Sequence, residues 1–236
     1  SDAGRYVKTG DSNAVFLVAQ TFTEATTDAS DWIDKSFFKV ARIKTIEMIT
    51  GEKENDWKLT RDDPDGDFTL VAAKEDEVLD QAKVTNMKGA FSNPAMEDVL
   101  STADASSDEN KAIEVTFKIS TFDGFNYHIT TGEKNEINQV PVSIKVSAKL
   151  NEKREAGEDE SDEDKERLDK EFQDNQTELK TKLANEKKLE GNTYLVRSYL
   201  IDNISKPRSD LLVSEDADAG GALSLIHISE PTRQIV

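Results

Sequence analysis

The chain has 236 residues, which predicts one or two domains, and its formal net charge of −18 argues against a nucleic-acid partner because phosphate backbones would be repelled. It contains no cysteine, which excludes disulfides, thiolate catalysis and cysteine metal sites. Its two histidines, His128 and His227, are too few for a histidine-rich zinc site. No apolar run approaches the roughly 20 residues of a membrane-spanning helix.

The first half of the chain predicts short strands separated by polar turns, with two helical segments. The expected strands are, in order, 6–9, 14–18, 43–48, 57–61 and 68–71. Residues 28–38 predict a short helix, which Ser30 or Asp31 could cap. Residues 75–100 predict a helix-rich block that is broken near Pro94, because proline disfavours a helical conformation at the residue before it.

The clearest strand signal begins at residue 115. Apolar and polar residues alternate over 115–119, 125–130 and 140–148. Asp123 and Gly124 predict a hairpin turn between the first two of these strands, because glycine accepts the positive φ that such a turn requires. We therefore expect an antiparallel meander with one buried face and one solvated face.

A highly charged segment follows the meander. Residues 151–190 hold 15 acidic and 9 basic residues, a composition typical of a solvated helix or a flexible arm. Within this segment, residues 158–190 predict one long helix, and the pattern leaves open whether the helix packs or projects. Its apolar residues form one narrow seam, made of Leu168, Phe172, Leu179 and Leu183. A strand over 194–196 follows.

Together these elements predict an α+β fold, with antiparallel meanders or hairpins, packed helices and one long charged helix. Residues 43–61 and 113–129 both show a strand, a polar turn and an aromatic-bearing strand, which favours two imperfect copies of one unit. The first unit would span 1–105 and the second 106–213, although the irregular spacing leaves the repeat open. We expect residues 214–222 to form a flexible acidic and glycine-containing tail.

Both ends of the chain have unusual sequences. The chain opens within a strand-like pattern, so we expect the first unit to be truncated at its N-terminus. Residues 223–233 resemble the translated end of a transposase sequencing adapter. We therefore expect 223–236 to be a non-native tail and leave His227 out of the fold, the alternative being a natural hydrophobic tail.

No residue is assigned a catalytic, cofactor-binding or metal-binding role. The acidic turn 62–67 could hold Ca²⁺ through its carboxylates, but Gly66 misses the sixth position that an EF-hand loop requires, so a polar turn is favoured. The acidic run 158–164 fits the positively polarised start of a helix. His128 lies on the polar side of its strand without a second histidine or a cysteine in the fold, which argues against a metal or triad role.

The remaining signals select no reaction. The sequence has no glycine-rich phosphate-binding loop. A carboxylate pair for glycoside hydrolysis stays open in a chain with 48 acidic residues, but no motif selects a pair. Trp32 and Trp57 are expected in the core rather than as ligand platforms. We therefore expect a protein that uses no cofactor and is not an enzyme.

Several short motifs point to one family. They are Tyr6-Val7-Lys8, Asp31-Trp32-Ile33-Asp34-Lys35, Trp57-Lys-Leu59-Thr-Arg61-Asp62, Asp123-Gly124-Phe-Asn-Tyr127 and Lys206-Pro-Arg-Ser-Asp-Leu211. They resemble the bacterial domain-of-unknown-function 4340 family over most of residues 5–213. The resemblance implies a domain outside the cytoplasm with an N-terminal membrane anchor, and some members lie beside genes of ABC-type or gliding-motility transport systems. No catalytic residues are established for the family, so none is carried over.

The resemblance and the absence of a catalytic motif predict a non-enzymatic extracytoplasmic accessory or scaffold domain of a cell-envelope transport complex. We expect protein partners in the envelope, and contact with the membrane only through an N-terminal anchor missing from this sequence. The first alternative is an envelope module that binds a polymer or a cation. A carboxylate-based hydrolase is the second.

Overall fold

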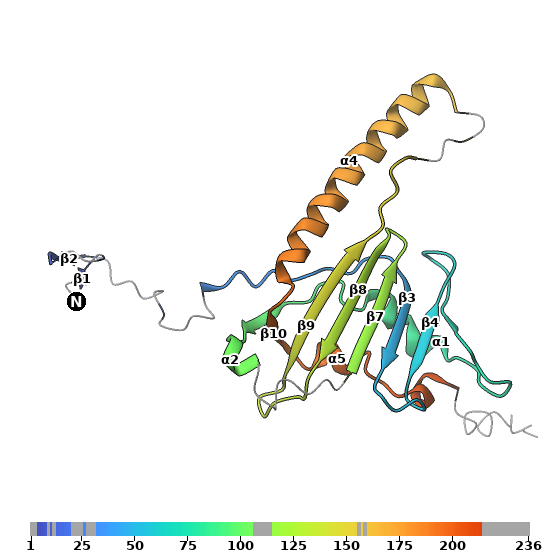
Figure 1. Cartoon of the computed structure of the whole chain (residues 1–236), viewed down its shortest axis with the longest axis horizontal. Coiled ribbons are helices and arrows are strands. Elements are labelled where there is room, and N and C mark those ends of the chain that lie inside the picture. The colour runs from blue at the N-terminus through green and yellow to red at the C-terminus, as the bar shows by residue number, and fades with distance from the viewer. Residues whose placement is uncertain are drawn as a thin grey trace, which may run out of the picture.

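The structure, a computed structural model, describes residues 4–8, 10, 13–19, 26, 32–105, 115–154, 157 and 160–213. Its main element is an eight-stranded sheet with the strand order β5-β4-β3-β7-β8-β9-β10-β6, in which every neighbouring pair is antiparallel (Figure 1). Its strands are β3 (Ile43–Ile49), β4 (Trp57–Thr60), β5 (Thr69–Leu70), β6 (Met96–Val99), β7 (Val115–Thr121), β8 (Phe125–Thr131), β9 (Gln139–Ala148) and β10 (Thr193–Arg197). The helices are α1 (Gln81–Val84), η2 (Thr85–Gly89), α2 (Thr102–Ala105), α4 (Asp162–Glu186), η3 (Lys187–Leu189), α5 (Tyr199–Asp202) and η4 (Arg208–Leu211). The α+β prediction is confirmed.

The predicted meander is formed by β7, β8 and β9. Their alternation places one set of side chains in the core, where Ile119 pairs across with Tyr127 and Tyr127 with Val146. Gly124 forms the β7–β8 turn at φ +84°, and a Cβ there would collide with the carbonyl oxygen of Lys149. The Lys149 amide donates to the Gly124 carbonyl at 2.9 Å, so the turn is tied to the segment that leaves β9.

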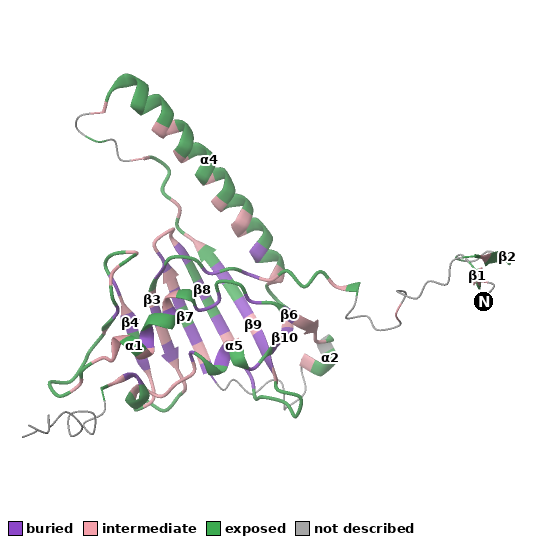
Figure 2. Ribbon diagram, turned by 180° about the vertical axis from the view of Figure 1, so that it is seen from behind, coloured by how far each residue is buried: buried purple, intermediate pink, exposed green. Residues whose placement is uncertain are grey.

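One face of the sheet carries the hydrophobic core. Figure 2 shows α1 and α5 in front of the strands on this side, whereas Figure 1 looks onto the opposite face. Segments outside the sheet bring Phe38, Met87, Phe91 and Ile204 into the same buried cluster as the strands. The centroids of the Phe38 and Phe91 rings lie 5.5 Å apart, a distance typical of aromatic pairs in contact. Burial of these side chains is the main stabilising contribution.

The C-terminal part of the long helix packs against the core, and its N-terminal part projects from the sheet. α4 has 25 residues and begins at Asp162, four residues after the predicted start, because the hydroxyl oxygen of Ser161 accepts from the Asp164 amide and caps the helix there. Leu179 and Leu183 pack against the core, and Glu186 is buried. The earlier turns extend beyond the edge of the sheet (Figure 1). Among the described residues, no helix is long and apolar enough to span a membrane.

The predicted block over 75–100 is only partly helical. α1 and η2 are single short turns, and 96–99 form β6, which pairs with β10 at the edge of the sheet. Met96 is buried on this strand. The prediction fails here because pairing with a distant strand outweighs the local helical pattern.

The expectations for residues 28–38 are also corrected. Ser30 and Asp31 lie outside the described residues, and the described part contains no α-helix; Ser36 instead forms a bridge with Ala95. Trp32 is 68% exposed and therefore not a core residue, because it lies ahead of the packed segment that starts at Phe37. Trp57 is buried as predicted, at 2% exposure.

The eight-stranded sheet takes strands from both sides of the predicted boundary at residue 105. β3 pairs with β7, and β6 pairs with β10. The division into two repeated units stays a prediction, and residues 214–236 lie outside the described residues.

A separate hairpin is formed by β1 (Arg5–Lys8) and β2 (Val15–Val18), as the sequence predicted. Within the part of the chain that the structure describes, its two strands pair only with each other. Tyr6, Phe16 and Leu17 are exposed on it.

Candidate functional site

The open face of the sheet carries polar side chains in ordered rows. Each residue of these rows directly faces its neighbour on the next strand. The first, the charged row, consists of Lys58, Glu47, Lys118, His128 and Lys145. The second, the hydroxyl row, consists of Thr60, Thr45, Ser120, Asn126 and Ser147. Both rows cross five strands in the order β4, β3, β7, β8, β9.

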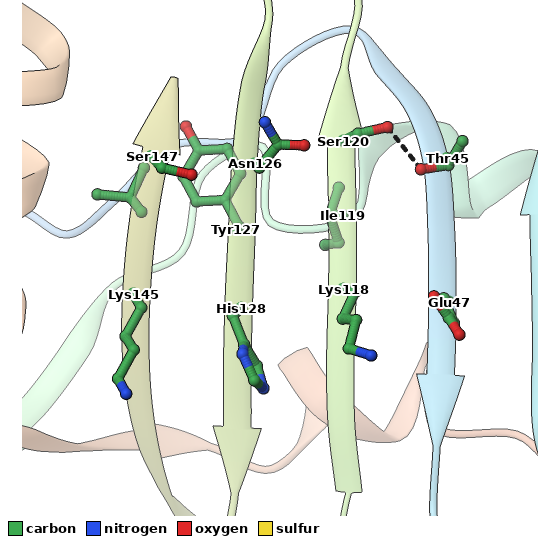
Figure 3. Close-up of a pocket in the computed structure, with 11 residues that line it drawn as sticks. Thr45, Glu47, Lys118, Ile119, Ser120, Asn126, Tyr127, His128, Lys145 and Ser147 are labelled. Atoms are coloured by element: carbon green, nitrogen blue, oxygen red, sulfur yellow. Dashed lines mark hydrogen bonds between the residues drawn. The ribbon is translucent and has the colours of Figure 1, made fainter. Parts of the chain in front are cut away.

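The central part of both rows lines an open depression of about 320 Å³ (Figure 3). The hydroxyl groups of Thr45 and Ser120 are hydrogen-bonded at 2.5 Å, which fixes the hydroxyl row between β3 and β7. Lys118, His128 and Lys145 are exposed above three adjacent strands. The depression is therefore a shallow polar surface that a ligand could lie across.

The charge of this surface is opposite to that of the whole chain. Lys58 pairs with Glu47 at 3.9 Å. Among the described residues, no carboxylate lies within ion-pair distance of Lys118 or Lys145. The charged row thus contains three lysines against one glutamate, in a chain with a net charge of −18. Lysine ammonium groups bind anions as point charges, and hydroxyl and amide groups can both donate and accept hydrogen bonds. This arrangement suits binding of an anionic, hydroxylated ligand.

A second polar cluster lies on the core side of the sheet, at the base of α4. The Tyr127 hydroxyl donates to Glu186 Oε2 at 2.9 Å, and the Lys39 amide donates to Glu186 Oε1 at 2.9 Å. Lys182 donates to the Tyr127 hydroxyl at 3.0 Å and lies 4.4 Å from the centre of the Phe125 ring. Burial, together with the Glu186 carboxylate, raises the pKa of Tyr127 above its ordinary range. Because both carboxylate oxygens already accept protein donors, we interpret this cluster as structural.

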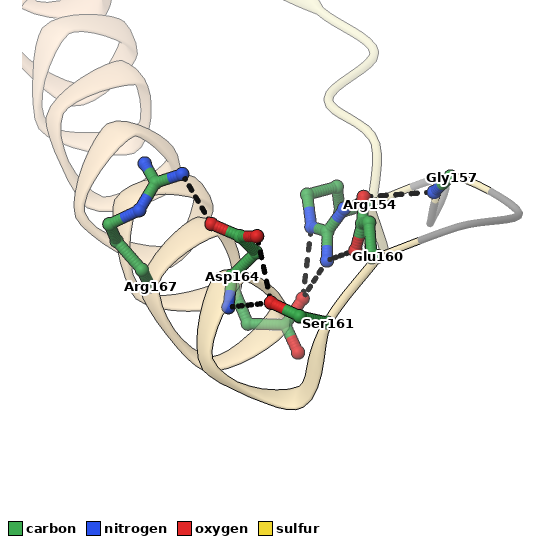
Figure 4. A network of polar contacts seen from close by, with 7 residues as sticks. Arg154, Gly157, Glu160, Ser161, Asp164 and Arg167 are labelled. Atoms are coloured by element: carbon green, nitrogen blue, oxygen red, sulfur yellow. Dashed lines mark hydrogen bonds and ion pairs between the residues drawn. The ribbon is translucent and has the colours of Figure 1, made fainter.

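A third polar network closes the tip of α4 (Figure 4). Arg154 donates to Glu160 Oε2 at 2.7 Å and to Asp169 Oδ1 at 2.9 Å, and the Gly157 amide donates to Glu160 Oε1 at 2.8 Å. The hydrogen bond from Arg154, followed by that from Gly157, lowers the pKa of Glu160 to about 2. This network joins the end of the β9 segment to the first turns of the helix.

The acidic turn 62–67 is arranged by Arg61. Its guanidinium is buried and donates to the Ile43 carbonyl at 2.6 Å and to the Pro64 carbonyl. The Asp65 amide donates to the Asp63 carboxylate at 2.7 Å. Among the described residues, no group of three or more His, Asp or Glu side chains is placed to hold a metal ion.

The acidic run 158–164 and His128 were also singled out in the sequence. Glu158 and Asp159 lie outside the described residues, and Asp162 to Asp164 form the first turn of α4. His128 lies on the solvated face of β8, as predicted, and forms part of the charged row. The row itself is not predicted from the sequence. The signal was available in the polar positions of three predicted strands, but their alignment depends on the register between strands.

Comparison with known families gives one match. Residues 1–113 match the model of the family described as Domain of unknown function (DUF4340), so this segment of the chain is similar to that family. No curated protein and no solved structure matches the chain. The match takes in Glu47 and Lys58, whereas Lys118, His128 and Lys145 lie beyond it. The charged row therefore spans the matched segment and the segment that follows.

Proposed function

We propose that this protein is a non-enzymatic accessory or scaffold domain that acts by binding a partner through the open face of its sheet. The observation that carries the proposal is the charged row with its depression, where Lys118 and Lys145 face solvent without a carboxylate partner among the described residues. A solvated sheet face needs no such excess of positive charge for folding, because its hydroxyl and amide groups are already compatible with water.

We also propose that the domain lies outside the cytoplasm, held at the membrane by an N-terminal anchor, as part of a cell-envelope transport complex. The support for this placement is the family resemblance. The fold supports only the binding role.

A hydrolase is less well supported. Such an enzyme needs two converging carboxyl groups, one of them with a raised pKa. The pKa values of Glu77, Glu97 and Glu160 are instead lowered, in each case chiefly by a hydrogen bond from an arginine. A carboxyl group held in its ionised form by arginine is unsuited to act as a general acid.

The test is site-specific photo-crosslinking in the native host. A photoreactive amino acid is placed at Ser147, in the hydroxyl row, and separately at Glu178, an exposed position on α4 that serves as the matched control. We expect a discrete adduct with a transport component from position 147, identified by mass spectrometry, and none from position 178. The adduct should be lost when Lys118→Gln and Lys145→Gln are combined. No adduct at 147, or equal adducts from both positions, would overturn the proposal.

A further inference from the structure

We infer that the open face binds a chain of an acidic polysaccharide. The polysaccharide lies across the β-strands and places its carboxylates near Lys58, Lys118 and Lys145. The inference rests on the proposed binding role of this face and names the chemistry of the ligand.

The spacing of the lysines favours an extended ligand with repeated charges. Lys58, Lys118 and Lys145 stand on β4, β7 and β9, so one strand separates each from the next. Neighbouring strands lie about 4.8 Å apart, which places successive lysine positions ~10 Å apart along the row. A small anion would use one of these lysines, whereas a polymer with regularly spaced carboxylates would use all three.

The neighbouring rows suit a hydroxylated polymer. The hydroxyl row runs along one side of the charged row. On the other side runs a row of hydroxyl-bearing residues, made of Thr116, Thr130, Ser143 and Thr193. These short side chains can donate to and accept from sugar hydroxyls directly or through water. A carbohydrate strand over the lysines would therefore find hydrogen-bond partners on both of its edges.

The same face is poorly suited to other polyanions. Its rows contain no aromatic residue on which the bases of a nucleic acid could stack. A nucleic-acid strand carries one charge per roughly 3.4 Å, about three times as dense as the lysine positions. The acidic first turns of α4 project away from the sheet and so leave the charged row accessible (Figure 1).

The experiment uses the purified full chain and polyuronate oligomers prepared from alginate, with neutral dextran oligomers for comparison, in a calorimetric titration at low salt. We expect binding of the polyuronate and none of the dextran. Combining Lys118→Gln with Lys145→Gln should weaken binding about tenfold, since the change removes two exposed ion pairs and each contributes modestly. The matched control combines Lys170→Gln with Lys180→Gln, two exposed lysines of α4, and should leave the affinity unchanged.

Four results of the titration would overturn the inference: no binding of the polyuronate, equal binding of dextran, equal weakening in both double variants, or tighter binding of polyglutamate than of polyuronate. The last result would point to an acidic polypeptide. Chemical-shift changes in the amide spectrum of the wild-type chain provide a measurement that needs no variant, and they should concentrate on β7, β8 and β9. Changes concentrated elsewhere would also overturn it.

The outcomes separate this inference from the proposed function. If polyuronate does not bind but the cellular adduct at position 147 still depends on Lys118 and Lys145, the inference fails and the binding face stands. If polyuronate binds at the charged row and no transport component is crosslinked, the inference stands and the role in a transport complex fails.

Discussion

The two ends of α4 are fixed by similar polar contacts in very different surroundings. At the base, Glu186 is 6% exposed and accepts hydrogen bonds from the Lys39 amide and the Tyr127 hydroxyl. At the tip, Arg154 pairs with Glu160, which precedes α4, and with Asp169 in the first turns of the helix. These turns extend beyond the sheet. Removing a partner from a buried polar cluster leaves the remaining groups without water, whereas the partly exposed groups of the tip pair can be rehydrated. The base should therefore determine the stability of the fold, and the tip only the local order of the projecting helix.

Loss of the buried carboxylate should have the largest effect. Glu186→Ala leaves the Lys39 amide and the Tyr127 hydroxyl without their acceptor. We expect the free energy of unfolding in urea to fall by about 3 kcal/mol, the range for breaking a buried polar pair. Glu178→Ala makes the same change at an exposed position of the same helix and should be nearly neutral. Equal losses of unfolding free energy in the two variants would contradict the larger stabilising role of the buried base of α4.

The apolar seam offers a second test of the same difference. Leu183 packs against the core near the base, whereas Leu168 belongs to the projecting part of the helix. Leu183→Ala should lower the free energy of unfolding by about 2 kcal/mol, at the lower end for leucine because the side chain is only partly buried. Leu168→Ala should lower it by less than about 0.5 kcal/mol. A larger effect at Leu168 would show that the projecting part has a packing partner.

The sequence predicted the elements whose pattern is local. The alternation in β7, β8 and β9 and the turn at Gly124 are properties of short segments, and the structure confirms them. The predicted helix 158–190 includes the whole of α4, which begins four residues later, because of the cap at Ser161, and ends four residues earlier. These features follow from periodicity and turn chemistry alone.

The sequence could not predict the features that depend on partners far along the chain. β6 is a strand because it pairs with β10, whose residues come about 100 positions later. The charged row exists because β3 pairs with β7 in a register that places Glu47 opposite Lys118. A shift of that register by one residue would turn every side chain of a strand to the other face, so the row cannot be inferred from the strands one by one.

The tip should respond to a mild substitution without a change in global stability. Glu160→Gln removes the charge that holds Arg154, so trypsin should cleave after Arg154 faster in the folded protein. The midpoint of urea unfolding should stay at the wild-type value, because the pair is remote from the core. Glu163→Gln, a matched change in the first turn of α4, should leave the cleavage rate unaltered. Unchanged cleavage in the Glu160 variant would show that the network does not order this segment.

The smallest expected effect is the acid response of the tip. The pKa of Glu160 is lowered from 4.5 to about 2, so its contribution to the order of the tip is fully present above pH 4.5 and is lost as the pH falls toward 2. The amide of Gly157, which donates to this carboxylate, should report the transition by NMR with a midpoint near 2.

Arg154→Gln should move the midpoint at Gly157 up toward 4.5, because it removes the main cause of the shift. The amide of Lys74 provides the internal control, since it donates to Glu77, whose pKa is lowered to about 2 by Arg208 rather than by Arg154. Its midpoint should stay the same in the variant. A common rise at both amides would mean that the substitution acts beyond the tip of α4, and would contradict a local effect of Arg154 on Glu160.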